Sequence, residues 1–509
     1  MKAKWPRIER KGTGCAAMVV VLGAAATGWI LQHSRSSQPP PTAIAAQLSA
    51  HDAIGFIAVE SPDTWLANLD RGAQDLSPEE RLVLAPFLSP ESRKAALGFD
   101  PTDAESWRAI GVAPERGLAL TFDAQHLAGT LPTPFLWTAP GAPRTPQLAG
   151  LKWAANEHWA SAALPIAGQP TPTTWTEAAS PRLDRDPVLQ AAFTDMPTEK
   201  CTALYLHADG LLAALRLHLK GEKLAALQYL TQRVRGLSLV LSPSGTGGRV
   251  VLSSDGVESL RQIFGSDAPN QPFSRFLPPN GVVALRVSLN LPELFDGLMT
   301  WLPPEWMEAR LGLASGRIGL LAVVGLNWTQ LERALSGHVV LAVELSAPST
   351  PETPVSWLAL LGVRDPAVTD AALTHLAQQN TQRGKPMGAV QVAGHPGWQS
   401  QQPPLVLVRV EETLIVAPSL AVAERALGRT KPLQKTPELD GDVVAGLAFV
   451  PALPDAIGLQ GWQKMLAGER PFVLGLYRDP HGLRLQAPPV PLSALLHGAA
   501  WYLRAPSAK

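Results

Sequence analysis

Residues 405–417 read LVLVRVEETLIVA, two short apolar runs separated by Glu411 and Glu412. Each run is rich in β-branched and aliphatic residues, which favours a strand, and the two acidic residues between them suit an exposed turn. A connection this short joins antiparallel strands, because parallel strands need a crossover of a dozen or more residues. The stretch therefore predicts a β-hairpin within an antiparallel or mixed sheet.

Helical segments follow several of the strands. After the apolar run Trp357–Val363, Asp365 suits a helix N-cap and Pro366 suits the first helical position. An apolar stripe at helical spacing comes next, formed by Val368, Ala372, Leu373 and Leu376. The sequence predicts an α+β fold: two degenerate repeats of mixed or antiparallel sheet with helices packed on one face, preceded by one transmembrane helix.

Four pairs of segments suggest an internal duplication. They are Asp52–Glu60 with Asn280–Ser288, Ser106–Phe122 with Gln330–Leu345, Ala203–Val234 with Trp357–Gln379, and Val250–Gly265 with Leu414–Arg429. We expect a first α+β unit at residues 51–270, a second at 271–430 and a C-terminal α+β extension at 431–509. Residues 124–200, rich in proline and tryptophan, are expected to be an insert in the first unit, packed as a lobe against the sheet edge.

The N-terminus predicts a membrane anchor. A basic flank, residues 1–11, precedes an uncharged stretch that ends at Leu31, and a Pro/Ser-rich tether follows at 33–50. About 20 apolar residues span a bilayer core, so residues 12–32 are expected to form a single-pass signal anchor in the inner membrane. The basic flank places the N-terminus in the cytoplasm and the bulk of the chain in the periplasm or outside the cell. The alternatives are a cleaved signal peptide and a buried core helix.

Composition and motifs favour binding over catalysis. The 43 basic residues balance 43 acidic ones, which argues against a nucleic-acid partner. The 11 histidines are scattered without metal-ligand spacing, and no phosphate-binding loop or nucleophile elbow is present. Cys201 is the cysteine outside the predicted anchor, so no internal disulfide is expected. We predict no cofactor, no metal and no enzymatic activity.

Tryptophans mark the candidate binding surface. The chain has 15 tryptophans but only 4 tyrosines, and several tryptophans lie in proline-rich stretches. Either they fill the core or they form an apolar surface that faces a ligand or a membrane. The candidates for such a surface are Trp137, Trp153, Trp159, Trp175, Trp301 and Trp306.

The tandem layout, the strand LIVAPS at 414–419 before a helix, and the N-terminal anchor resemble a family of bacterial envelope-anchored proteins of unknown function. The resemblance covers most of residues 51–430 and implies no catalytic residues. We expect an extracytoplasmic protein that acts by binding, as a scaffold or assembly partner. The alternatives are a protein of the cell envelope that binds lipid or another apolar ligand, and an enzyme whose site short motifs do not reveal.

Overall fold

The computed structural model places the chain in two compact units. It describes residues 53–59, 73–74, 76–91, 94, 100, 103–109, 117–128, 131–138, 153–155, 160–163, 185–196, 202–216, 219–242, 245–265, 273–278, 282–324, 327–344, 356–402, 404–429, 443–449, 472–489, 496 and 500. The first unit comprises Met1–Leu219, Arg235–Val251 and Pro489–Lys509. The second comprises Lys220–Val234 and Leu252–Pro488.

The first unit is built on an antiparallel sheet with β1 in its interior. Its strands are β1 (Ala53–Val59), β2 (Leu118–Ala128), β3 (Leu131–Thr138), β4 (Trp153–Ala155), β5 (Ala160–Ala163), β6 (Thr202–His207), β7 (Val234–Ser242) and β8 (Gly245–Leu252). The pairings run β4–β5–β3–β2–β1–β6–β7. The helices are α4 (Pro78–Leu88), α6 (Ala104–Ala109), α7 (Pro187–Phe193) and α8 (Ala208–Leu215).

Aromatic packing holds α7 against this sheet. The rings of Phe56 on β1, Phe193 on α7 and Tyr205 on β6 lie within 6.1 Å of one another, measured between centroids. Asp186 caps α7 by accepting from the backbone N–H of Val188, and its other carboxylate oxygen lies 3.3 Å from Nε2 of the buried His207. The helix is therefore fixed to the sheet by apolar contact and by a buried polar pair.

The second unit has a longer antiparallel sheet with β9 in its interior. Its strands are β9 (Val282–Ser288), β10 (Leu335–Glu344), β11 (Ser356–Val363), β12 (Met387–Val392), β13 (His395–Gln401), β14 (Pro404–Val410), β15 (Thr413–Ala417), β16 (Val443–Phe449), β17 (Phe472–Asp479) and β18 (Gly482–Ala487). The pairings run β18–β17–β16–β9–β10–β11–β15–β14–β13–β12.

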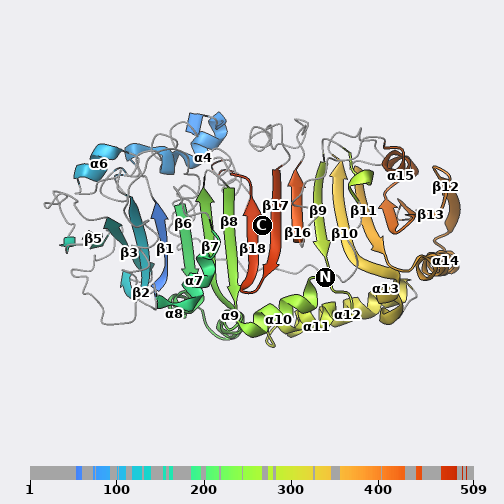
Figure 1. Cartoon of the computed structure of the whole chain (residues 1–509), viewed down its shortest axis with the longest axis horizontal. Helices are drawn as coiled ribbons and strands as arrows, with labels where there is room; N and C mark the ends of the chain where they lie inside the picture. The colour runs from blue at the N-terminus through green and yellow to red at the C-terminus, as the bar shows by residue number, and fades with distance from the viewer. Residues whose placement is uncertain are drawn as a thin grey trace. The chain divides into compact units, whose positions relative to one another are not determined.

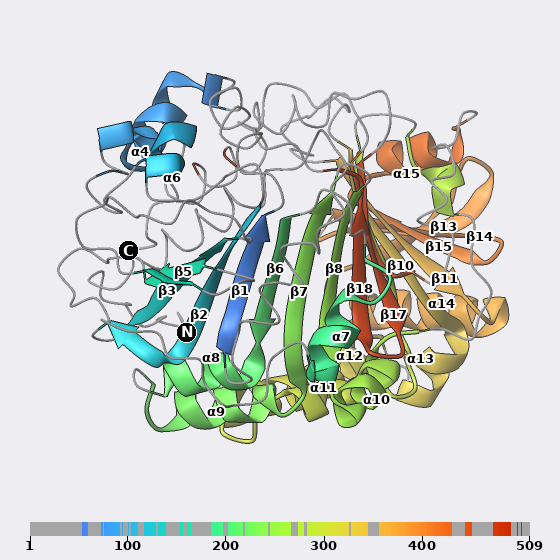
Figure 2. The same ribbon diagram turned by 60° about the vertical axis from the view of Figure 1, so that its left-hand side comes forward.

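Most helices of the described sequence belong to the second unit. They are α9 (Glu222–Thr231), α10 (Ser254–Ile263), the 3₁₀ helix η3 (Phe273–Phe276), α11 (Leu294–Trp301), α12 (Met307–Val324), α13 (Trp328–Ala334), α14 (Pro366–Gln382) and α15 (Leu420–Leu427). Figures 1 and 2 both show α10 to α13 in a row along one end of the strands, with α15 near the other end.

Helices cover both faces of β14 and β15. Val408 and Ile415 pack on one face with Val422 and other residues of α15. Leu407 and Leu414 pack on the opposite face, with Leu373 and Ala377 of α14. Two-sided burial explains why these strands are continuous apolar runs rather than alternating ones.

A buried ion cluster also fixes α15 to the sheet. Glu344 at the end of β10 is 5% exposed. Its carboxylate accepts from Arg429 and from the Ser356 hydroxyl, and it lies 3.5 Å from Arg425. Arg429 also donates to the backbone carbonyl of Phe276. The two arginines compensate a carboxylate that burial alone would strongly destabilise.

The predicted fold class is wrong in its main features. All strand pairings described within the two units are antiparallel, one of the two sheet types that were expected. The sheets dominate the architecture, however, so the fold is mostly sheet and not an α+β repeat. Helices lie on both faces of β14–β15 instead of one face. In the predicted insert, residues 124–200, the strands β3, β5 and β4 extend the sheet from β2, where a separate lobe was expected.

The predicted anchor, residues 12–32, lies outside the described residues. Within the part of the chain that the structure does describe, no helix is both long and apolar enough to cross a membrane. The fold class is thus corrected to a largely antiparallel β architecture with flanking helices.

Several local predictions are confirmed. Residues 405–417 form the β14–β15 hairpin, with Val410 opposite Thr413 and Glu411 at a φ of 52° in the turn. The segments Asp52–Glu60 and Asn280–Ser288 contain β1 and β9, each of which pairs on both sides. The segments Ala203–Val234 and Trp357–Gln379 instead contain β6 and β11, which occupy different places in the two pairing orders.

Candidate functional site

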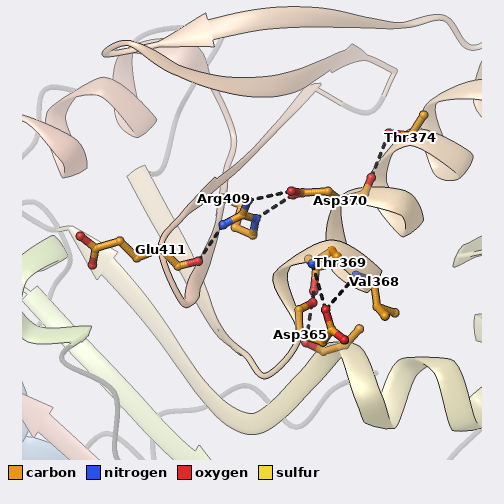
Figure 3. Close-up of polar contacts among 9 residues, drawn as sticks. Asp365, Val368, Thr369, Asp370, Thr374, Arg409 and Glu411 are labelled. Atoms are coloured by element: carbon orange, nitrogen blue, oxygen red, sulfur yellow. Dashed lines mark hydrogen bonds and ion pairs between the residues drawn. The ribbon is translucent and has the colours of Figure 1, made fainter.

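The candidate site lies where α14 crosses the end of the second unit's sheet. Asp365 starts the helix by accepting from the backbone N–H groups of Ala367 and Val368, and Pro366 follows at the first position. The Thr369 hydroxyl donates to the carbonyls of Asp365 and Ala334, which ties this first turn to α13. Figure 3 shows these contacts beside Asp370 and Arg409. These contacts fix the first turn of α14 and so fix the position of Asp370, which follows directly.

A hairpin follows α14 and forms the opposite side of the site. β12 and β13 pair in the register Val392–His395 to Met387–Ser400, around a turn of Ala393 and Gly394. Both turn residues have positive φ, 48° and 85°, as a type I′ turn requires. β13 then pairs with β14, which carries Arg409.

An ion pair spans the site from α14 to β14. Arg409 Nε and Nη2 donate to the two carboxylate oxygens of Asp370, each at 2.7 Å, and Nη1 donates to the backbone carbonyl of Glu411 at 2.9 Å. Hydrogen bonding to Asp370 raises the pKa of Arg409 further, partly opposed by burial, so the guanidinium stays charged. The Arg409 side chain is 25% exposed and that of Asp370 is 52% exposed, so ligands can reach the pair.

A pocket of about 440 Å³ lies between the helix and the hairpin. Its lining combines apolar walls with the ion pair and two further polar side chains. The lining residues are Asp370, Leu373, Thr374, Ala389, Val390, Gln391, Pro396, Gly397, Trp398 and Arg409. A cavity of this size with a few fixed polar groups is typical of a binding site for a small molecule or a short peptide segment.

The chemistry of the pocket favours recognition. Guanidinium has five N–H donors, and the described contacts use one each on Nε, Nη1 and Nη2. One N–H on each terminal nitrogen is therefore left for a ligand carbonyl or carboxylate. Asp370 is held by two charge-assisted hydrogen bonds, which orient it and neutralise its charge. Trp398 and Leu373 supply apolar surface beside this polar group.

Of the six predicted tryptophans, the structure describes the side chains of Trp301 and Trp306, and neither lines this pocket. Trp137 lies on β3 opposite Ser161, and Trp153 begins β4 opposite Ala162. Trp159 and Trp175 lie outside the described residues. That part of the prediction stays open.

The other two tryptophans flank a helix break in the second unit. α11 ends at half-buried Trp301, and α12 begins after Trp306, which is 44% exposed, with Pro303 and Pro304 between them. Arg310 donates to the carbonyls of Met299 and Leu302 and so ties α12 to the end of α11. Trp306, Met307, Leu311 and Ile318 are exposed on this side.

Sequence reasoning found α14 but missed the pocket. Asp370 and Arg409 are 39 residues apart, and no local pattern links them. The β12–β13 hairpin was also missed, because its turn is Ala393-Gly394 rather than the usual Asn-Gly and because Pro386, Pro396 and several glycines interrupt the strands. The sequence signals for these two strands were the alternating Val390 and Val392 before the turn and Trp398 after it.

No group of three or more histidine, cysteine or acidic side chains is placed to hold a metal within the described residues. No protein-family model, curated protein or solved structure matches the chain. What the fold and site define is therefore a class of site: an open pocket between a helix and an edge hairpin, with one fixed guanidinium and a tryptophan wall.

Proposed function

We propose that the chain is a membrane-anchored, extracytoplasmic binding protein that engages a partner protein through the α14–hairpin pocket. Residues 12–32 would anchor it in the inner membrane, with the N-terminus in the cytoplasm. The two sheet units would then present the pocket outside the cytoplasm, as a scaffold or assembly component does. The anchor and the location rest on the sequence alone.

One observation carries the binding role: the pocket is accessible, yet its polar groups are already fixed in position. Arg409 and Asp370 hold each other through two hydrogen bonds, so a ligand meets an oriented donor rather than a mobile side chain. Preorganisation of this kind lowers the entropic cost of binding. Trp398 beside the ion pair adds the aromatic surface that dominates many interfaces.

Site-specific photo-cross-linking in living cells tests this role. A photoreactive amino acid at Thr374, on the exposed face of α14 at the pocket, is expected to give a discrete protein adduct. The adduct should be lost when Trp398→Ala is added. Leu82, exposed on α4 of the first unit, is the matched control position. No adduct from Thr374, or the same adduct from Leu82, would overturn the proposal.

Protease accessibility tests the location. Spheroplasts of cells that express the full chain are treated with protease, and the fragments are detected by antibodies against each unit. We expect residues 51–509 to be digested without lysis. Protection until lysis would place the units in the cytoplasm and contradict the proposal.

A second candidate function, binding of a lipid or another apolar ligand, is favoured by an open aliphatic sheet face. Leu285 on β9 pairs with Leu341 on β10, and these side chains are 38% and 50% exposed. Ala359 on β11 continues the row. Native mass spectrometry of the detergent-purified chain would show a bound lipid mass, reduced by Leu341→Gln. Recovery of the bare protein mass after incubation with lipids would exclude this candidate.

A further inference from the structure

We infer that the outer edge of β12 takes up an extended, acidic segment of the partner as an added β-strand. This inference rests on the proposed function, because the edge adjoins the same pocket. β12 pairs with β13 on one side. Gly388, Ala389 and Gln391 are exposed, and a Cβ built on Gly388 would meet nothing within 4 Å. Within the described part of the chain, β13 is the one strand that pairs with β12, so the other edge of β12 is there available to an added strand.

The hairpin turn fixes which backbone groups of β12 face outward. Val392 and His395 flank a two-residue turn and so form a hydrogen-bonded pair. Because bonded and non-bonded pairs alternate, Val390 and Gly388 also bond to β13. Ala389 and Gln391 then direct their N–H and C=O groups away from β13. Such outward groups are the ones with which an added strand pairs.

The pocket lies beside these outward groups. Ala389, Val390 and Gln391 line it from β12, and Leu373 and Thr374 line it from α14. A strand added to β12 would lie in the plane of the sheet at this edge, next to the face that α14 covers. Alternate side chains of a strand point to the same face, so an aliphatic residue of the added strand can enter the pocket while its backbone pairs with β12.

The charges around this edge select an acidic segment. Residues 383–402 carry Arg383 and Lys385 and no carboxylate. Asp370 is the acidic residue of α14, and Arg409 neutralises it. Aspartate or glutamate residues in the added strand would meet a cationic surface, which favours both encounter and register.

The test uses the full chain in detergent and a blocked peptide of about eight residues, a usual strand length. The peptide has glutamates at both ends and alternating threonine and aliphatic residues between them. Gln391→Pro removes one outward N–H that the β12–β13 ladder does not use, and Gln391→Ala retains it. A peptide N-methylated at alternate amides tests the same hydrogen bonds from the other side.

We expect the peptide to bind the wild type and Gln391→Ala equally and to slow amide hydrogen exchange across 387–392. Gln391→Pro and peptide N-methylation should each weaken binding by about tenfold or more, and replacement of the glutamates by lysines should do the same. Unchanged exchange protection of α14 in Gln391→Pro shows that the variant is folded. If that protection is lost, the N-methylated peptide on the wild type decides.

Two results would overturn strand addition. One is binding that tolerates N-methylation or leaves β12 unprotected. The other is no binding of the peptide at about 1 mM. The cross-link from Thr374 separates this failure from that of the proposed function: a Trp398-dependent adduct without peptide binding would leave the pocket as a partner site reached by another mode.

Discussion

The two units arrange their strands in the same pairing order up to a point and then differ. In each, an interior strand, β1 or β9, pairs on one side with the next strand along the chain and on the other with a strand made much later. The order then continues as β2–β3–β5–β4 in the first unit and as β10–β11–β15–β14 in the second. What the units share is thus an order of antiparallel pairing.

The two units differ in one connection, which runs from β3 to β4 in the first unit and from β11 to β14 in the second. The first unit connects β3 to β4 through residues 139–152, a stretch too short for a helix of the length of α14 and two strands. The second unit connects β11 to β14 through residues 364–403, which form α14, β12 and β13. These added elements, with Arg409, build the pocket. The antiparallel sheet is thus common to both units, whereas the pocket is an addition to one of them.

The largest effect is expected from deletions that remove strands on one side of this comparison. Deleting residues 126–198 with a Gly/Ser bridge removes β3, β4, β5 and α7, and with them Leu189 and Ala192 of the first unit's core. We expect the first unit to unfold. Replacing residues 364–403 by a linker as long as 139–152 should keep β9, β10 and β11 protected in hydrogen exchange. If the first unit folds after its deletion, residues 126–198 are not part of its core. If β9–β11 lose protection after the replacement, residues 364–403 are not a mere addition to the second unit.

A large effect is also expected at the buried carboxylate of the second unit. Glu344→Ala leaves Arg429 and Arg425 without their buried partner, which typically costs about 3–5 kcal/mol of unfolding free energy. The matched control is Glu258→Ala, which breaks an exposed pair with Arg261 in the same unit and should cost less than about 1 kcal/mol. Urea denaturation of both variants measures the difference. Equal costs would show that the cluster does not hold α15.

A pH-dependent effect is expected in the first unit. Burial raises the pKa of Tyr205, so the folded state favours the neutral phenol. Its contribution to stability is complete below the unfolded pKa of about 10 and is lost as the pH rises above that value. Tyr205→Phe should remove this part of the loss of stability at alkaline pH, because phenylalanine does not ionise. The substitution should break no hydrogen bond, since the hydroxyl has no partner among the described residues. The urea midpoints of the wild type and of Tyr205→Phe, measured between neutral pH and pH 11, test this prediction. An identical dependence of the midpoint on pH in both proteins would contradict the role of Tyr205.

The smallest effect on stability is expected at the site itself. Asp370→Asn weakens an accessible ion pair, so the free energy of unfolding should change by no more than about 1 kcal/mol. The Thr374 cross-link should nevertheless fall, because Arg409 is no longer held in place. Thermal unfolding and adduct yield are measured on the same variant. A large loss of stability with an unchanged adduct yield would show that the Asp370–Arg409 pair stabilises the fold and does not contribute to binding.

Local patterns in the sequence predicted elements better than architecture. Asp365 and Pro366 correctly marked the start of α14, and the residues 405–417 correctly marked a hairpin, because caps and tight turns depend on neighbouring residues. The same strands were assigned helices on one face only. Their continuous apolar runs already indicated burial on both faces, which α14 and α15 provide.

The site was beyond such patterns. Arg409 meets Asp370 only because β13 and β14 return beneath α14, and that depends on a turn whose residues are weak sequence signals. The strand correspondences also depended on local likeness. Val250–Gly265 and Leu414–Arg429 both carry a strand followed by a capped helix, β8 before α10 and β15 before α15, which is a likeness of local sequence.

The two-sided pairing of β1 has a consequence for how the chain acquires its structure. β1 ends at Val59, but its second partner, β6, begins only at Thr202. β9 likewise ends at Ser288 and waits for β16, which begins at Val443. Sheets closed by such distant segments fold slowly, because the entropy of closing a long loop is lost before the contacts form. During synthesis, each unit's first strand therefore stays without its second neighbour until most of that unit has emerged.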